Sequence, residues 1–133
     1  MKKGFTLIEL LVVIGIFGII LLIVVPSTIR ILNSSIENTM KIQEKEVEDA
    51  AKLFLEDYCK TPLDSNKVCP LSKTMIDGIA YFNGELNLDI LVDNEYINDV
   101  SLRNNECIGK IIILNNEAKA YLKCGEAYTT EGY

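Results

Sequence analysis

The sequence predicts an α+β protein. A long N-terminal α-helix, first transmembrane and then amphipathic, packs against a small three-stranded antiparallel β-sheet that carries two disulfides. Three observations support this prediction. Glu9 is the only charged residue from Phe5 to Ile29, apolar residues then recur at helical spacing as far as Tyr58, and four cysteines and a hairpin pattern follow. We therefore expect a transmembrane and assembly helix over residues 5–29, an amphipathic helix over 30–58 and a globular head over 59–133.

Length and composition restrict the possible functions. The chain has 133 residues and a mass of 14.9 kDa, which allows one small domain and an anchoring element. Its formal charge of -6 argues against electrostatic capture of nucleic acid, so no direct nucleic-acid partner is predicted. The absence of histidine removes the commonest general base and zinc ligand. We expect no enzyme activity, no catalytic residue, no cofactor and no metal.

The apolar run is long enough to cross a membrane. The uncharged positions from Leu10 to Ile29 span roughly 30 Å as a helix, the thickness of a bilayer core. A cleaved secretory signal would be shorter and would end in small residues, whereas this run continues to Pro26. Lys2 and Lys3 precede it, so the positive-inside rule places the N-terminus in the cytoplasm. The prediction is a single-pass protein of the cell membrane, in contact with lipid, whose head is extracytoplasmic.

Glu9 is unusual within this run. A charged side chain near the membrane centre costs roughly 2.5 to 3.5 kcal/mol on insertion scales, and less towards the interface. The function of a simple membrane anchor does not explain such a carboxylate. The residue therefore indicates an interaction partner.

The string KKGFTLIELLVVIGIFGIILLIVVP resembles the prepilin N-terminus of type IV pilins and of the pseudopilins of type II secretion and competence systems. The resemblance covers Lys2 to about Leu32. It implies that residues 1–4 are a leader peptide and that a membrane prepilin peptidase cuts between Gly4 and Phe5. The same enzyme would then methylate the new amino group of Phe5. The cut precedes the apolar helix and leaves it on the protein.

The resemblance also implies a role for Glu9 in assembly. Cleavage places a cationic amine at Phe5, about one helical turn from the carboxylate. When subunits stack, Glu9 of one subunit pairs with the Phe5 amine of another in a low-dielectric environment. We interpret this pair mainly as a device that fixes register, because desolvation offsets much of the Coulomb attraction. The expected partners are other pilin subunits, the prepilin peptidase and a pilus or secretion assembly platform.

Two residues favour a kink or local unwinding in the apolar helix. Pro26 removes an amide donor and clashes with the preceding turn, and Gly18 is a weak helix former. Proline is also simply tolerated in many membrane helices, and both interpretations stay open. In resembling proteins the matching stretch loosens when a subunit enters a filament.

Beyond Pro26 the helix continues with one apolar face and ends before Thr61 and Pro62. The predicted face recurs mostly at three- and four-residue spacing, and Gln43 interrupts it. We interpret this face as the contact with the head. Its members are Ile29, Leu32, Ile36, Met40, Val47, Ala50, Phe54 and Tyr58.

The cysteines predict two disulfides. Residues 110–114 and 117–123 form a hairpin about Asn115 and Asn116, which tolerate the positive φ of a type I′ turn. This register places Cys107 opposite Cys124 in a non-hydrogen-bonded pair, about 4.5 Å apart at Cα. Cys59 then pairs with Cys69 and closes the loop after the helix.

Between the helix and this hairpin we expect a short helix over residues 86–93, with Asn94 near its C-cap, and a strand near residues 100–102. The stretch LDILVDNEYI resembles the helix and turn that precede the sheet in many pilin heads. Asp89, Asp93, Glu95 and Asp99 could be calcium ligands. Their spacing fits no calcium-binding loop, so we interpret them as a solvated acidic face.

The functional prediction is a structural subunit, a prepilin that is processed, methylated and assembled through its N-terminal helix into a type IV pilus fibre at the cell surface. One alternative is a pseudopilin of a type II secretion or competence DNA-uptake system. Another is a membrane-tethered extracellular binding domain that never polymerises. Roles in cell adhesion or motility would follow from the first.

Overall fold

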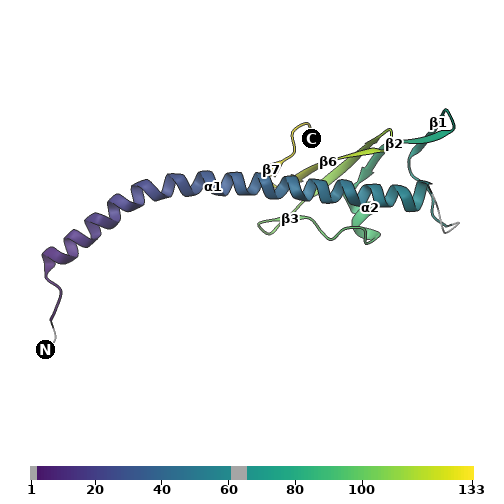
Figure 1. Cartoon of the computed structure of the whole chain (residues 1–133). Helices are drawn as coiled ribbons and strands as arrows, with labels where there is room; N and C mark the ends of the chain where they lie inside the picture. The colour runs from purple at the N-terminus through teal and green to yellow at the C-terminus, as the bar shows by residue number, and fades with distance from the viewer. Residues whose placement is uncertain (1–2, 61–65) are drawn as a thin grey trace. The chain divides into compact units, whose positions relative to one another are not determined.

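The computed structural model describes residues 3–60 and 66–133. The chain separates into two compact units, residues 1–37 and 38–133, and helix α1 (Leu7–Leu55) contributes to both. A short π-helix, η1 (Glu56–Lys60), follows it. The predicted long N-terminal helix is therefore confirmed (Figure 1). The predicted stop at Thr61 and Pro62 lies outside the described residues.

In the first unit, α1 shows apolar side chains on all sides. Exposed fractions are, for example, 77% at Leu22 and 61% at Phe17. The helix assignment continues through Gly18 and Pro26. Next to the proline, the hydroxyls of Ser27 and Thr28 donate hydrogen bonds to the carbonyl oxygen of Val24 at 2.8 and 2.7 Å. Serine and threonine hydroxyls commonly make such bonds to a carbonyl three or four residues earlier in a helix. The kink at Gly18 and Pro26 stays a prediction.

The second unit contains a five-stranded antiparallel sheet in the order β1-β2-β5-β6-β7. A six-residue helix, α2 (Leu88–Asp93), follows β2 and ends at Asn94, close to the predicted position. The strands are β1 (Ser72–Ile76), β2 (Ile79–Asn87), β5 (Ile108–Leu114), β6 (Glu117–Cys124) and β7 (Tyr128–Thr129).

The sheet has two more strands than the three predicted. A hairpin joins β1 to β2 through Asp77 and Gly78, whose φ angles of 51° and 79° suit a two-residue turn. The strand predicted near residues 100–102 exists as β3 (Ser101–Leu102). It pairs with β4 (Asn105–Glu106) in a separate two-stranded sheet. The place beside β5 in the main sheet is occupied by β2.

The predicted β5–β6 hairpin register is confirmed. Leu114 pairs with Glu117, and the pairing continues to Ile108 with Lys123. Asn115 and Asn116 adopt φ angles of 52° and 70°. Asn116 also ties the turn to β2: its side-chain oxygen accepts from the amide of Phe82 at 2.8 Å, and its amide group donates to the Ala80 carbonyl at 3.0 Å.

The core lies between the C-terminal half of α1 and one face of the sheet. Met40, Val47, Ala50 and Phe54 are buried, which confirms this part of the predicted apolar face. The side-chain oxygen of Gln43, which interrupts that face, is buried without a hydrogen-bond partner. The sheet and α2 contribute Phe82, Leu86, Leu91, Ile111, Ile113, Ala120 and Leu122.

Two disulfides are present, Cys59–Cys69 and Cys107–Cys124, and both match the predicted pairs. The Cα separation of Cys107 and Cys124 is 4.2 Å, the short separation expected for a non-hydrogen-bonded pair. Cys59 of the first disulfide lies in η1, directly after α1. The second disulfide joins the residue before β5 to the last residue of β6. Covalent links of this kind suit a head too small to depend on hydrophobic burial alone.

Candidate functional site

Gly4 and Phe5 lie in irregular, exposed chain immediately before α1. Phe5 is 84% exposed. Apart from its two chain neighbours, a Cβ atom built on Gly4 would meet no atom of residues 3–60 and 66–133 within 4 Å. Nothing in this surrounding structure therefore requires glycine at position 4. A requirement for glycine there would have to come from another molecule that binds this segment.

The first turn of α1 is closed by a reciprocal pair of hydrogen bonds between Thr6 and Glu9. The amide of Glu9 donates to the Thr6 hydroxyl oxygen at 3.3 Å, and the amide of Thr6 donates to Oε2 of Glu9 at 3.1 Å. This is the capping box of the pattern Thr-x-x-Glu. The carboxylate also lies at the positive end of the helix dipole, where negative charge is favourable.

Sequence reasoning missed the role of Thr6. The signal was present, because Thr6 precedes an apolar helix and Glu9 follows three residues later. The capping box gives Glu9 a partner within its own chain and fixes where its side chain points. The hydrogen bonds of the capping box do not replace the predicted ion pair with a second subunit, because that pair depends on the charge of the carboxylate.

Glu9 keeps acceptor capacity for such a partner. Both bonds from Thr6, including one from its hydroxyl at 3.1 Å, end on Oε2. Within residues 3–60 and 66–133 no hydrogen bond is found to Oε1. Lys3, Gly4, Phe5 and Glu9 line one open hollow of about 230 Å³. The bond predicted to be cut and the carboxylate predicted to pair with the new amine are thus in the same place.

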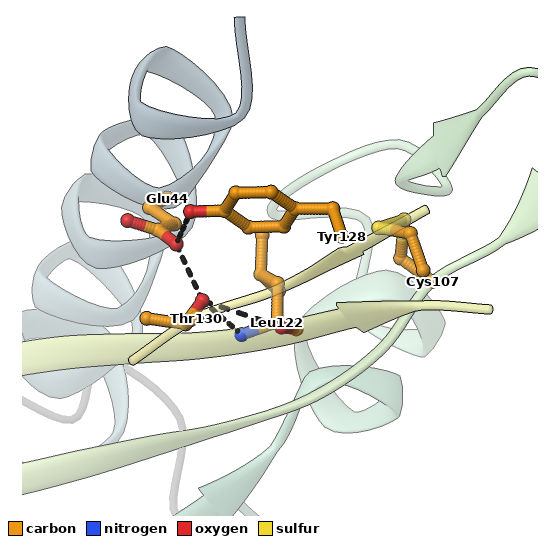
Figure 2. Close-up of a disulfide and its surroundings, with 6 residues drawn as sticks. Glu44, Cys107, Leu122, Tyr128 and Thr130 are labelled. Carbon is orange, nitrogen blue, oxygen red and sulfur yellow. Dashed lines mark hydrogen bonds between the residues drawn. A yellow bond between two sulfur atoms is a disulfide. The ribbon is translucent and has the colours of Figure 1, made fainter. Parts of the chain in front are cut away.

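In the second unit, two carboxylates one helical turn apart join α1 to the edge of the sheet that is formed by β6 and β7. Oε1 of Glu44 accepts hydrogen bonds from the hydroxyls of Tyr128, at 2.7 Å, and of Thr130 (Figure 2). The Thr130 hydroxyl in turn accepts from the amide of Leu122 at 2.9 Å. Glu48 accepts from the amide of Ala120 at 3.1 Å. These contacts satisfy donors of β6 that have no strand partner, which protects a sheet edge.

Tyr96 forms a second link between the head and the end of the helix. Its hydroxyl donates to Oδ2 of Asp57 at 2.7 Å, and its ring meets that of Phe54 edge-on with centroids 5.6 Å apart. Burial, assisted by the hydrogen bond to Asp57 and by its negative charge, raises the pKa of Tyr96 to about 12. Ionisation of this phenol would place two negative charges side by side.

In the described part of the chain, one helix is long and apolar enough to cross a membrane. Its most apolar 18-residue window has a mean hydropathy of 3.2, and none of that window is buried. A signal sequence meets the same criterion, so length and composition alone do not decide between the two. The helix is suited to membrane anchoring before assembly. No group of three or more side chains that could hold a metal ion occurs among residues 3–60 and 66–133.

Comparison with known protein families matches residues 1–25 to the prokaryotic N-terminal methylation motif. No curated protein and no solved structure matches the chain. The motif is the prepilin-type cleavage and methylation signal that marks the type IV pilin and pseudopilin family, whose members are structural and not enzymatic. The chain carries this motif at its N-terminus, and its long helix, antiparallel sheet and two disulfides form a pilin-like α+β fold.

Proposed function

We propose that the chain is the precursor of a structural subunit of a type IV pilus fibre. A prepilin peptidase removes residues 1–4 and methylates the amino group of Phe5. The mature subunit then enters the fibre through its apolar helix. The observation that carries the proposal is an exposed Gly4–Phe5 bond directly before a capped helix whose apolar surface is bare.

The surroundings of Gly4 support processing. The segment is exposed, and a Cβ atom at position 4 would have open space around it in the part of the chain that the structure describes. An enzyme that reads the segment is a sufficient reason for a residue without a side chain. The cut leaves Thr6 and Glu9 in place, so the capped first turn survives in the mature subunit.

The apolar helix supports assembly. In water its exposed leucine, isoleucine, valine and phenylalanine side chains would have to be covered. A membrane covers them before assembly, and the helices of neighbouring subunits cover them afterwards. Glu9 fixes the register by pairing with the Phe5 amine of another subunit, because a shifted register leaves two unpaired charges in an apolar environment.

The same helix defines the proposed topology. Lys2 and Lys3 hold the N-terminus on the cytoplasmic side, and the two disulfides suit an oxidising, extracytoplasmic head. A kink between Gly18 and Pro26 would let the helix lengthen inside a fibre. The partners are other pilin subunits, the prepilin peptidase and an assembly platform. We propose no catalytic residue, cofactor or metal for the chain itself.

Fractionation of cells that express the full chain tests this proposal. Fibres are sheared from the surface, and their subunits are identified by mass spectrometry beside the membrane fraction. The matched control is the same strain without its prepilin peptidase. We expect the chain in sheared fibres only when the peptidase is present. A processed chain confined to short assemblies at the membrane would favour the pseudopilin alternative, and an unprocessed chain that stays in the membrane would favour a tethered binding domain.

A further inference from the structure

Charges of opposite sign are concentrated in different parts of the head. Residues 85–106 contain six carboxylates and a single basic residue, Arg103. Residues 108–124 contain three lysines and a single carboxylate, Glu117. The overall charge of -6 hides this separation.

The three lysines occupy the outer face of the β5–β6 hairpin. Lys110 pairs with Tyr121 across the two strands, and Lys119 and Lys123 flank that tyrosine at alternate positions of β6. The intervening residues Ala120 and Leu122 are buried, so the lysines lie on the side away from the core. We call Lys110, Lys119 and Lys123 the lysine face.

The charge of this face is available to a partner. Lys119 and Lys123 are exposed, whereas Lys110 is half-buried with its ammonium 5.7 Å from the ring centroid of Tyr133. Lys119 lies over Tyr121 at 5.4 Å. None of the ion pairs found among residues 3–60 and 66–133 involves a lysine of this face. Ile108 and Ile112 are exposed between the charges and add apolar area.

The complementary surface is formed by α2 and the segment that follows it. Asp89, Asp93, Glu95 and Asp99 are all exposed, and we call them the acidic surface. Asp89 and Asp99, with Glu106, line a hollow of about 110 Å³ whose other walls include Leu88, Val92 and Val100. Apolar walls with a carboxylate rim suit a lysine, whose alkyl stem packs on apolar atoms while its ammonium stays with the charges.

We propose that in the fibre the lysine face of one subunit docks on the acidic surface of a second copy of this chain. This inference rests on the proposed function, and it names a contact between heads in addition to the packing of the helices. The two surfaces differ, so the contact is heterologous, and such a contact propagates along an open helical filament. The pairing of opposite charges sets orientation and suppresses wrong neighbours.

A second copy fits this face better than a nucleic acid does. A polyanion that approaches the three lysines also meets the negative field of the rest of the chain. Every copy, in contrast, brings an acidic surface of its own to every lysine face. Because exposed ion pairs are individually weak and screened by salt, the contact gains from repetition along the fibre.

Cross-linking of the full chain on intact cells tests the contact directly. Cells that already hold the unlabelled chain are transferred to nitrogen-15 medium before fibre assembly is induced, so that single fibres contain both forms. The fibres are then treated with a carbodiimide, which joins an amine to a carboxylate without a spacer. Mass spectrometry then distinguishes links within one chain from links between two. We expect links between chains from Lys119 or Lys123 to Asp89, Asp93, Glu95 or Asp99. Links between the helices of different chains show that a sample has assembled. If such a sample lacks the links between heads, the proposal is overturned.

Charge reversal provides the second arm. Lys119→Glu with Lys123→Glu should reduce these links and the yield of sheared fibres by roughly tenfold or more, since like charges then face each other. Combination with Asp89→Lys and Asp99→Lys should restore the yield and should give links between chains that join positions 89 or 99 to positions 119 or 123. The matched control is Lys45→Glu with Lys73→Glu, two exposed lysines outside the face, which should keep the wild-type yield. An equal loss in the control, or no recovery in the combination, contradicts the proposal.

Folding and function are separated by the remaining measurements. Non-reducing gels show whether a variant has formed both disulfides, and Lys119→Gln with Lys123→Gln offers a milder neutralisation that should give a smaller loss. If the lysine variants keep the wild-type fibre yield but the sheared fibres lose binding to duplex DNA, the face belongs to nucleic acid and the proposal is wrong. If wild-type chains are linked in the membrane but never enter fibres, the proposed function fails while the contact stands.

Discussion

At the scale of single residues, the structure separates two roles for the carboxylate in the apolar run. Glu9 closes the capping box with Thr6, a role that needs hydrogen-bond acceptors but no charge. The proposed pairing with the Phe5 amine of another subunit needs the charge. Substitutions that keep one property and remove the other therefore distinguish the two.

Glu9→Gln keeps the capping box, because glutamine also serves at this position, but removes the charge. Loss of one partner of a buried ion pair costs about 3–5 kcal/mol, so we expect incorporation into sheared fibres to fall by roughly a hundredfold or more. Quantitative mass spectrometry of the fibres measures this. Glu9→Ala, which loses both roles, should incorporate no better. Wild-type incorporation of Glu9→Gln would show that the carboxylate serves the helix end alone.

Gly4→Val tests whether another molecule reads the leader. The structure offers open space at this position, so the substitution should leave the folded head unchanged. We expect the precursor to keep residues 1–4 because the wider side chain no longer fits the peptidase. The intact mass of the membrane-bound chain shows the outcome, and Gly15→Ala, also in open space, serves as a control that should be cleaved. Normal cleavage of Gly4→Val would show that the peptidase does not require glycine at this position.

Tyr96 should respond to high pH. Its pKa is raised from 10.0 to about 12 because burial and Asp57 disfavour the phenolate. The protonated phenol therefore contributes stability fully below pH 10, and this contribution is lost as the pH rises through 12. Spectroscopic titration of tyrosinate should show a step near 12 that is absent from Tyr96→Phe. A wild-type titration without that late step would contradict the assignment.

At the scale of elements, the contact of α1 with the edge of the sheet depends on Glu44 and Glu48. Helix and sheet are joined at this edge by charge-assisted hydrogen bonds in addition to apolar packing. The short strand β7 is held between Lys123 and Cys124 on one side and the carboxylate that binds Tyr128 and Thr130 on the other. The second disulfide fixes the end of β6 against which this segment pairs.

Glu44→Ala should destabilise the head. It removes the acceptor of two hydroxyl groups, and bonds to charged groups contribute about 1.5–3 kcal/mol each, so we expect a loss of about 3 kcal/mol or more in the free energy of unfolding. Denaturant unfolding of the full chain in detergent measures the change. Glu46→Ala, an exposed carboxylate on the same helix, should have little effect. Equal stability of the two variants would show that the Glu44 contacts contribute nothing.

Sequence reasoning predicted those elements whose signals are local. The Asn115–Asn116 turn fixed the hairpin register and hence the disulfides, and helical spacing predicted the buried face around Val47. The β1–β2 hairpin was missed although Asp77 and Gly78 are a turn signal, because every residue of β1 is exposed and its sequence has no apolar alternation.

Other features could not be predicted from local patterns. Strand β7 has only two residues and depends on its neighbours in the fold. The contacts of Glu44 and Glu48 could not be predicted, since nothing in the sequence indicates that β6 leaves amide donors beside them. Gln43 was noticed because it interrupts the apolar face, and its buried oxygen without a partner has no explanation in the structure.

At the scale of the whole molecule, two kinds of surface lack a partner among the described residues, 3–60 and 66–133. The first unit exposes an apolar helix, and the second exposes separated positive and negative surfaces on its head. A monomer in water would leave the apolar helix exposed to solvent. An oligomer of identical copies can bury the apolar helix and pair the charged surfaces of the heads. In the proposed assembly, the disulfides and the carboxylate links would keep the head intact while the surroundings of the helix change from lipid to protein.

The most direct test of the proposed assembly is the mass of the amino-terminal peptide of the chain recovered from sheared surface fibres. Processing followed by assembly predicts a peptide that begins at Phe5 and carries one added methyl group on its amine. A fibre subunit that keeps residues 1–4, or a secreted product that begins beyond Pro26, would contradict it, because either result removes the amine that Glu9 is proposed to meet.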